Sequence, residues 1–314
     1  MNKIVIERKL KSFWHYSHEQ NKLLTGGSKM KRITLLIAVC FLAMTVFVPV
    51  VFGALSGEQG HDKYIYPVVR VTGAGGTGSG TILYSKYTSD TAEGCSTYVL
   101  TNYHVVDGAI RVIEKFDKDL GKDVKEEKLS ICHVEIFKYR DLSTPIGTLK
   151  VEADIVIHSR EQDMALLKLR SEEEIKTIAQ LLTKEQVNDI KCLDETVAVG
   201  CSLAFPPLPT TGILTRKNFQ IDSLPFHMSS AQIIYGNSGG AMFDGQGNFI
   251  GIPSMLVVAG WGTPITHMGL FIPVSRVYEW LEEEHYDFIY DTVKTEKECL
   301  EVREKEIKEK KEKQ

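Results

Sequence analysis

Three short stretches contain residues whose types could together perform acyl-transfer chemistry, and the first surrounds a serine with glycines. Ser238 lies in "GNSGGAMFD", preceded by Gly236 and Asn237. Glycine accepts positive φ and lets another backbone or a ligand approach closely. The segment is therefore typical of a tight turn, and also of a strained turn that presents a nucleophile beside free backbone N–H groups.

A histidine and an aspartate precede Ser238, each at the edge of an apolar strand pattern. His104 follows "YVLTNY", and Asp163 opens "DMALLKL". In this order Ser238 would be the nucleophile, His104 the base that accepts its proton, and Asp163 the carboxylate that orients the imidazole. The N–H groups of Gly236 and Ser238 would then form the oxyanion hole.

Other residues compete for these roles. His158 is the rival base, and Asp154 is a weaker candidate for the carboxylate. The pattern G-x-S-x-G also fits the nucleophile elbow of an esterase, which requires a helix after the serine. The residues that follow, "AMFDGQGNFIGI", indicate a hairpin instead. The esterase interpretation would use other acid and base partners, namely Asp287 or Asp291 with His267 or His285.

Most of the chain has the pattern of short β-strands. Runs rich in β-branched and aromatic residues, bounded by Gly, Asp, Ser and Asn, fill residues 64–170 and 195–274. Residues 171–188 show helical periodicity with a capping box, and a second helix begins near Pro273. We therefore expect an all-β protein with two packed halves, a connecting helix and a C-terminal helix. Residues 295–314 carry Glu and Lys at helical spacing, which is typical of a solvated helix.

Charge and composition exclude several classes of partner. Residues 1–32 hold eight basic and two acidic residues, so the rest of the chain has a net charge of −10. An acidic body disfavours binding to the phosphate backbone of nucleic acid, so we expect no nucleic-acid partner. No Cys/His spacing suits a metal, so we expect no metal and no cofactor. One or two disulfides are compatible with the cysteines beyond the apolar run, which are Cys95, Cys132, Cys192, Cys201 and Cys299.

Residues 33–55 form an uncharged apolar run that is long enough to span a bilayer. Basic residues precede it, which predicts a cytoplasmic amino end and an exported body. A transmembrane anchor and a cleaved signal peptide both fit this run. "MKRITLL" from Met30 has the form of a compact signal start, so we hypothesise that translation begins there and that residues 1–29 are misannotated. Residues 56–66 are expected to be a linker.

The stretches "TNYHVV", "DMALLKL" and "GNSGGAMFD" together resemble the catalytic blocks of the chymotrypsin-like serine proteases, in particular the HtrA/DegP-type branch. Supporting blocks "GTGSGTIL", "VAVGCSLAF" and "GLFIPVSRV" follow in the same order. The resemblance covers about residues 67–283 and implies two six-stranded β-barrels, at about 67–170 and 190–283, followed by a charged tail at 284–314.

This resemblance implies an exported serine endopeptidase that cleaves unfolded or extended polypeptides in envelope protein quality control or processing. It also implies a homo-oligomer, often a trimer. The first alternative is a catalytically silent interaction protein with the same fold, and the second, less favoured alternative is a serine esterase. Asn237 stands where digestive enzymes have Asp, as in HtrA-type enzymes, and no PDZ domain follows in this sequence. Segments 84–94 and 116–150 exceed the compact family pattern, and we favour surface elaborations over substrate-gating loops.

By the same resemblance, Gln232 lies at the floor of the specificity pocket, and Ser254 and Met255 line its wall. Gln232 offers no carboxylate, so we expect no strong preference for Arg or Lys before the cleaved bond. Small or medium apolar side chains should be preferred there.

Overall fold

The computed structural model describes residues 54–87, 94–117 and 121–312. These residues belong to one compact unit that spans Phe52–Gln314. In the described ranges no helix has the length and apolar character needed to cross a membrane. The basic segment 1–32 and the predicted span 33–55, apart from its last two residues, lie outside these ranges.

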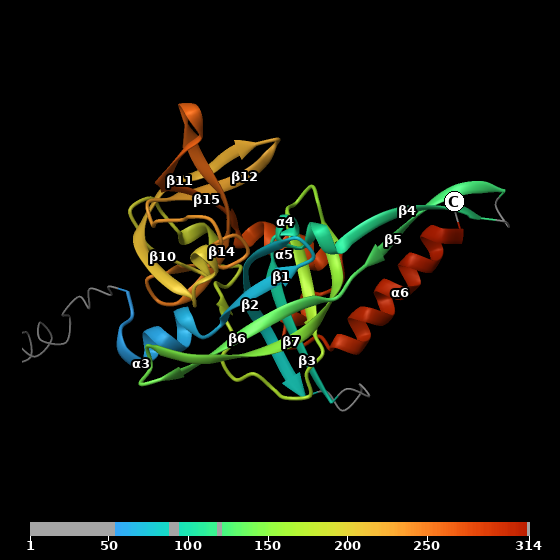
Figure 1. The fold of residues 1–314 in the computed structure, drawn as a ribbon, viewed down its shortest axis with the longest axis horizontal. Helices are drawn as coiled ribbons and strands as arrows, with labels where there is room; N and C mark the ends of the chain where they lie inside the picture. Colours follow the sequence, from blue (N-terminus) through green and yellow to red (C-terminus); the bar gives the residue numbers. More distant parts are fainter. Residues whose placement is uncertain (1–53, 88–93, 118–120, 313–314) are drawn as a thin grey trace, which may run out of the picture. The chain divides into compact units, whose positions relative to one another are not determined.

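The first half of the described chain forms a closed barrel of six strands in the order β1-β2-β3-β8-β7-β6 (Figure 1). Val69, Val71, Ile82, Val99 and Leu167 are almost completely buried inside it. Burial of such side chains contributes about 1.5–3 kcal/mol each. The strands are β1 (Val68–Gly73), β2 (Gly76–Tyr87), β3 (Cys95–Thr101), β6 (Cys132–Arg140), β7 (Thr144–Ser159) and β8 (Met164–Leu169).

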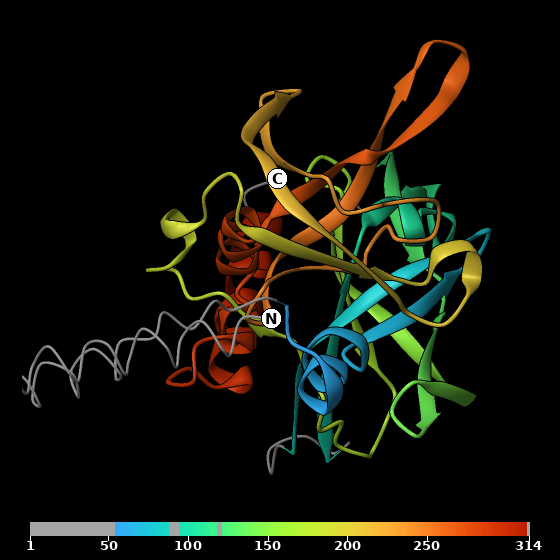
Figure 2. The same ribbon diagram turned by 90° about the vertical axis from the view of Figure 1, so that its left-hand side faces the viewer.

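The second half forms another ring of six strands, which closes because β13 pairs with both β10 and β14. A short strand, β9 (Gln180–Leu181), runs parallel to β14 at its side. Figure 2 shows hairpins β11–β12, in gold, and β14–β15, in orange, extending beyond the ring. The prediction of two six-stranded barrels is thus confirmed. The strands are β10 (Glu195–Gly200), β11 (Leu208–Ile221), β12 (Leu224–Ser229), β13 (Ala241–Asp244), β14 (Asn248–Ala259) and β15 (Thr263–Pro273).

The predicted connecting helix at 171–188 is wrong. Apart from the short strand β9, this segment is irregular, with bends and turns, and it ends in a single 3-10 turn, η3 (Val187–Asp189). Its backbone N–H groups bond to the barrels instead: Ala179 donates to the carbonyl of Ile82 at 2.8 Å, and Leu182 to that of Phe249 at 3.0 Å. Ala179 and Leu182 are also buried. Tertiary hydrogen bonds and burial therefore override a weak local helix propensity.

Short helices and turns connect and flank the barrels. The expected linker forms α3 (Gly57–Gly60) and a π-helical turn, η1 (His61–Ile65), in which Tyr64 is buried against the core. The helix predicted after Pro273 is α5 (Val274–Glu283). The others are α4 (Tyr103–Val106), η2 (Asp107–Ala109), η4 (Ser202–Ala204), η5 (Gly260–Gly262), η6 (Asp287–Ile289) and α6 (Glu296–Glu312).

The start of the C-terminal helix α6 is fixed to the first barrel. Oε1 of Glu296 accepts hydrogen bonds from the hydroxyls of Ser96 at 3.0 Å and Tyr98 at 2.7 Å, and from Nζ of Lys168 at 3.3 Å. Glu296 is only 5% exposed. A carboxylate buried to this degree requires such partners, so the tail begins as part of the folded body.

A β-hairpin projects from the first barrel between α4 and β6 (Figure 1). Its strands, β4 (Ile110–Asp117) and β5 (Lys122–Leu129), pair with each other in a sheet of their own. The cysteines of the described residues are all free thiols, so none of them forms a disulfide there.

Candidate functional site

The pairing of β3 with β8 brings two of the candidate residues together. Thr101, the last residue of β3, lies opposite Ala165 near the start of β8. His104 follows β3 in the short helix α4, and Asp163 directly precedes β8. Antiparallel pairing places the end of one strand beside the start of its neighbour, so the two side chains meet at one edge of the first barrel.

His104 and Asp163 form a close hydrogen-bonded pair. Nδ1 of His104 lies 2.9 Å from Oδ1 and 3.0 Å from Oδ2 of Asp163, and the backbone N–H of His104 donates to Oδ1 at 3.1 Å. The side-chain amide of Asn102 donates to the carbonyl of Asp163 at 2.8 Å. With the Nδ1 proton donated to a carboxylate, Nε2 is left as the acceptor that a general base needs.

Asp163 is held from a second side by a residue of the other barrel. Ser254 on β14 donates its hydroxyl to Oδ2 of Asp163 at 2.6 Å. Asp163 itself has a φ of 54°, in the left-handed region that aspartate tolerates better than most residues. Ser254 was expected to line the specificity pocket. In the structure its hydroxyl is engaged by the carboxylate, a role for which the sequence offers no motif.

The pKa of His104 is raised above its ordinary value of 6.5. Burial, the largest single influence, lowers it, but the hydrogen bond to Asp163 and the charges of Asp163 and Asp107 raise it by more. A nearby anion favours the protonated imidazole. The same interaction would stabilise the imidazolium formed when His104 accepts a proton.

Ser238 joins this group through Ser254. Its hydroxyl donates to the carbonyl oxygen of Ser254 at 3.4 Å, while no hydrogen bond links it to Nε2 of His104 within the described residues. A contact of 3.4 Å is long for a hydroxyl donor. The serine therefore gives up little by turning toward the imidazole, and catalytic hydrogen bonds often tighten only when substrate binds.

The turn around Ser238 leaves two N–H groups free. In the part of the chain that the structure describes, the N–H groups of Gly236 and Ser238 donate to no protein acceptor, whereas those of Asn237 and Gly239 do. Asn237 donates to the carbonyl of Ile234, and Gly239 to that of Pro253, both at 3.1 Å. Free N–H groups beside a nucleophile are what an oxyanion hole requires.

Glycine is required at position 236 for two reasons. Its φ is 97°, which L-residues rarely adopt, and a Cβ there would lie 2.5 Å from the carbonyl oxygen of Cys201. The hydroxyl of Ser79 donates to the carbonyl of Gly236 at 2.6 Å, and its N–H donates to that of Ser238 at 2.8 Å. Ser79 was missed as a site residue, although its segment "GTGSGTIL" was one of the supporting blocks.

Asn237 supports the same turn from inside. It is buried, and its Oδ1 accepts the hydroxyl of Ser202 at 2.6 Å and the N–H of Ile234 at 3.4 Å. Two further candidates lie away from these contacts. Gln232 is exposed, its carbonyl accepting the hydroxyl of Thr210 at 2.7 Å, and Met255 is half-buried on β14.

The rival residues are engaged elsewhere. Nε2 of His158 lies 3.0 Å from a carboxylate oxygen of Glu127, and Asp154 forms a two-point ion pair with Arg170 at 2.7 and 2.8 Å. Residues of the esterase alternative also lack a link to Ser238 within the described chain: His285 pairs with Glu306, Asp287 with Lys294, Asp291 accepts the N–H of Val293, and His267 is exposed on β15.

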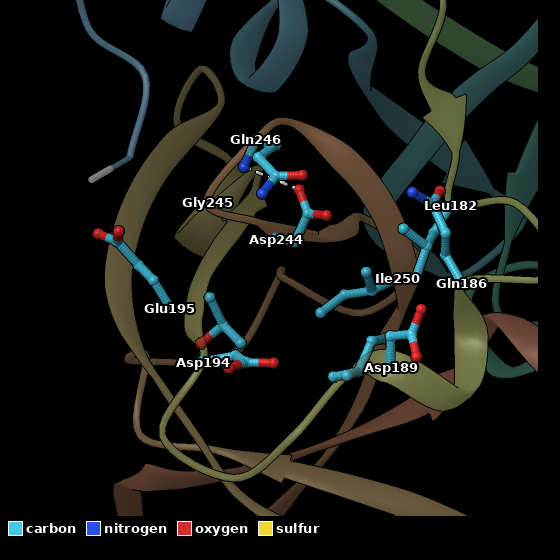
Figure 3. A pocket seen from close by; sticks show the side chains of 11 residues that line it. Leu182, Gln186, Asp189, Asp194, Glu195, Asp244, Gly245, Gln246 and Ile250 are labelled. Carbon is cyan, nitrogen blue, oxygen red and sulfur yellow. Dashed lines mark hydrogen bonds between the residues drawn. The ribbon is translucent and has the colours of Figure 1, made fainter. Parts of the chain in front are cut away.

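A separate hollow of about 360 Å³ lies on the second barrel (Figure 3). Acidic side chains line it, including Asp189, Asp194 and Glu195, but none of the three candidate catalytic residues does. Across the described ranges, no cluster of His, Cys, Asp and Glu is arranged to hold a metal ion.

Comparisons with known proteins agree with this architecture. The family model described as "Trypsin-like peptidase domain" matches residues 78–252. The "Serine protease Do-like HtrA" of Lactococcus lactis subsp. lactis is 28% identical over 213 residues, which cover 64% of this chain and 42% of that protein. The "Probable periplasmic serine endoprotease DegP-like" of Halomonas elongata is 27% identical over 176 residues, covering 55% and 29% respectively. The chain thus spans less than half the length of these curated relatives.

Among solved structures, "HtrA-type protease AlgW with tripeptide" aligns with a TM-score of 0.52 at 22% identity, covering 74% of this chain and 64% of that one. At this identity the likeness concerns the fold. The family model, however, spans more than half of the sequence, and the chain therefore belongs to the trypsin-like peptidase domain family.

Proposed function

We propose that this protein is a serine endopeptidase that cleaves unfolded or extended polypeptides, with Ser238, His104 and Asp163 as its catalytic triad. The observation that carries the proposal is the hydrogen-bonded pair of Asp163 and Nδ1 of His104, with Ser254 lying between this pair and Ser238. The hydroxyl of Ser254 donates to Asp163, and its carbonyl oxygen lies 3.4 Å from the hydroxyl of Ser238.

In the first step, His104 accepts the proton of the Ser238 hydroxyl at Nε2 while Oγ attacks the scissile carbonyl carbon. Asp163 stabilises the imidazolium that forms. The carbonyl oxygen becomes an oxyanion, and the free N–H groups of Gly236 and Ser238 bind it. His104 then donates its proton to the leaving amine, the C–N bond breaks, and an acyl-enzyme remains on Ser238.

In the second step, a water molecule takes the place of the amine. His104 accepts a proton from it, the resulting hydroxide attacks the ester carbonyl, and the proton returns to Oγ of Ser238 as the acid product leaves. Removing one oxyanion donor from such a site typically lowers the rate by about 10²–10³. The two N–H groups are therefore as necessary to the proposal as the three side chains.

Substrate preference rests on Gln232 and Met255, which we propose as pocket residues together with the backbone at Ser254. Gln232 is uncharged, so a strong preference for Arg or Lys before the cleaved bond is not expected. We propose apolar residues of small or medium size at that place in the substrate, because no carboxylate at position 232 is available to pair with a cation.

A role outside the cytoplasm is proposed from two observations. The apolar run at residues 33–55 is typical of a membrane anchor or a signal peptide, and relatives such as that of Halomonas elongata are named periplasmic. We propose envelope protein quality control or processing as the role. Oligomerisation, as a trimer of this chain, is proposed from the resemblance to HtrA-type enzymes.

The test is cleavage of casein, an unfolded protein, by the full-length protein beside its Ser238→Ala variant. Loss of the nucleophile should lower the rate by about 10⁴–10⁶. Equal cleavage by both would exclude Ser238 as the nucleophile.

A second candidate function is a protease-fold interaction protein without turnover. It is favoured by one observation: the Ser238 hydroxyl points to the carbonyl of Ser254 and not to His104. If this orientation is locked, the full-length protein should bind unfolded casein without cleaving it, and Ser238→Ala should bind equally well.

A further inference from the structure

Hairpin β4–β5 is inserted beside the candidate catalytic histidine. β4 begins directly after the turn η2, six residues beyond His104, and the N–H of Ser130 donates to the carbonyl of Ala109 at 2.8 Å to close the base of the hairpin. Its two strands pair only with each other in the described residues. An isolated two-stranded sheet of this kind is marginally stable alone, and each strand keeps an open edge.

One face of this hairpin exposes large apolar side chains among charged ones. Alternating residues along β4 share a face, which places Ile110, Val112, Glu114 and Phe116 together, and the register adds Leu129 opposite Ile110. Val112 is 57% exposed, Phe116 59% and Leu129 47%. We name these three exposed side chains the apolar stripe. Side chains of this size are seldom left in water together unless a partner covers them.

The same face reaches the catalytic end of the barrel. Glu127, directly opposite Val112, extends from this face to Nε2 of His158 on β7, at 3.0 Å. The ring of His158 in turn lies against that of Tyr103, with centroids 5.7 Å apart, and Tyr103 is the neighbour of His104. The face that carries the apolar stripe is therefore linked, through Glu127 and His158, to Tyr103, the neighbour of His104.

The chemistry fixes which part of a substrate would lie here. His104 gives its proton to the amine of the leaving segment, so the polypeptide on the carboxyl side of the cleaved bond must pass close to His104. On this face β4 carries Ile110, Val112 and Phe116 beside one charged residue, Glu114, whereas β5 carries Asp123, Lys125 and Glu127 beside Leu129. A third strand would therefore find apolar partners along β4 and an open row of backbone groups at its edge.

We propose that β4 binds the leaving segment of an extended polypeptide substrate as an added β-strand, with apolar side chains at every second position packed on the apolar stripe. This rests on the proposed endopeptidase function and adds a binding surface to it. It also replaces the interpretation of this part of segment 116–150 as mere surface elaboration.

The test uses the full-length protein and the double variant Val112→Ser/Phe116→Ser. The matched control is Ile146→Ser/Leu149→Ser on β7, which also replaces two exposed apolar residues of a projecting hairpin. Each is assayed on fluorescein-labelled casein and on p-nitrophenyl acetate, an ester that has no polypeptide leaving segment. We expect the hairpin variant to lower kcat/KM on casein about tenfold, mainly through KM, with ester hydrolysis and the control unchanged. Unchanged casein cleavage, or an equal loss on the ester, would overturn the proposal.

A binding measurement separates this inference from the endopeptidase proposal. In the Ser238→Ala background, the anisotropy of a fluorescein-labelled decapeptide with alternating valine and serine gives a Kd that needs no turnover. The hairpin substitutions should weaken this Kd about tenfold, whereas the same peptide with every valine replaced by serine should bind weakly to both. If the wild-type protein hydrolyses neither casein nor the ester, the endopeptidase proposal fails, but this Kd still tests whether β4 binds an extended peptide. Equal binding of the valine peptide by Ser238→Ala and by Ser238→Ala with the hairpin substitutions would refute binding to β4.

Discussion

Two opposing influences act on the pKa of His104, and their net effect should be visible in the pH dependence of activity. Burial disfavours its charged form, whereas the Asp163 carboxylate favours it, and the net result is a pKa above 6.5. A general base must be unprotonated, so activity is low below this pKa and rises as the pH passes through it.

The acid limb of kcat/KM should therefore have its midpoint above pH 6.5. Asp163→Asn removes the anion, so the midpoint should move to lower pH while kcat falls by about 10⁴, because the imidazole loses its orienting carboxylate. Profiles of casein cleavage from about pH 5 to 9 check both effects. A wild-type midpoint at or below 6.5, or no shift in the variant, would contradict the assigned pairing.

The candidates His104, Asp163 and Ser238 could be named from the sequence because their three motifs occur in the chain order His, Asp, Ser. Ser79 and Ser254 were not assigned their structural roles. Their hydroxyls act on Gly236 and Asp163, which lie 157 and 91 positions away in the chain. Such contacts arise when two barrels pack, and no local pattern in one strand encodes them.

At the scale of elements, the turn that presents Ser238 is defined by its neighbours as much as by its own glycines. The segment after β10 contacts it closely: the N–H of Leu203 donates to the carbonyl of Tyr235 at 2.9 Å, and Cys201 lies directly against Gly236. The conformation of the turn around Ser238 therefore depends on a segment from another part of the second barrel.

Gly236→Ala should lower kcat/KM on casein by about 10²–10³, since the turn must rearrange and withdraw an oxyanion donor. Gly147→Ala is the control, because a Cβ at that position meets no atom within 4 Å. Thermal unfolding of both variants should show whether the fold is intact. Full activity of a folded Gly236→Ala protein would contradict the proposal that this turn supplies an oxyanion donor.

Strands were predictable because their alternation and their Gly, Asp and Asn boundaries are local properties. The structure of the connector 171–188 was not predictable in this way. It has helical periodicity in the sequence, but its backbone N–H groups donate to the carbonyls of Ile82 and Phe249. The strand β4 falls within the predicted strand runs, whereas β5 lies in segment 116–150, which the sequence indicated only as added length. The pattern of hairpin β4–β5 alone does not tell whether it joins the barrel or stands apart.

At the scale of the whole molecule, the C-terminal tail fastens to strands that carry the site. Glu296 bonds Tyr98 on β3 and Lys168 on β8, which are cross-strand partners. The same two strands lead to His104 and from Asp163. Tyr286 and Phe288 add edge-to-face contacts with the ring of Tyr98. The charge pattern of residues 295–314 predicted a helix, and it gave no indication that its first turn is buried.

Glu296→Ala should lower the free energy of unfolding by about 1–3 kcal/mol, because the buried hydroxyls of Ser96 and Tyr98 lose their charged hydrogen-bond acceptor. Glu301→Ala on the exposed side of the same helix should change it by less than about 0.5 kcal/mol. Chemical denaturation of both variants provides the comparison. Equal, small effects would mean that the tail is not anchored through Glu296.

The most direct test of the central claim is the site of labelling by a fluorophosphonate, which reacts with an activated serine. The full-length protein should be modified at Ser238, as located by mass spectrometry of its peptides, and His104→Ala should abolish the labelling by removing the base. Labelling at another residue, or casein cleavage by a protein that remains unlabelled at Ser238, would contradict the proposed triad.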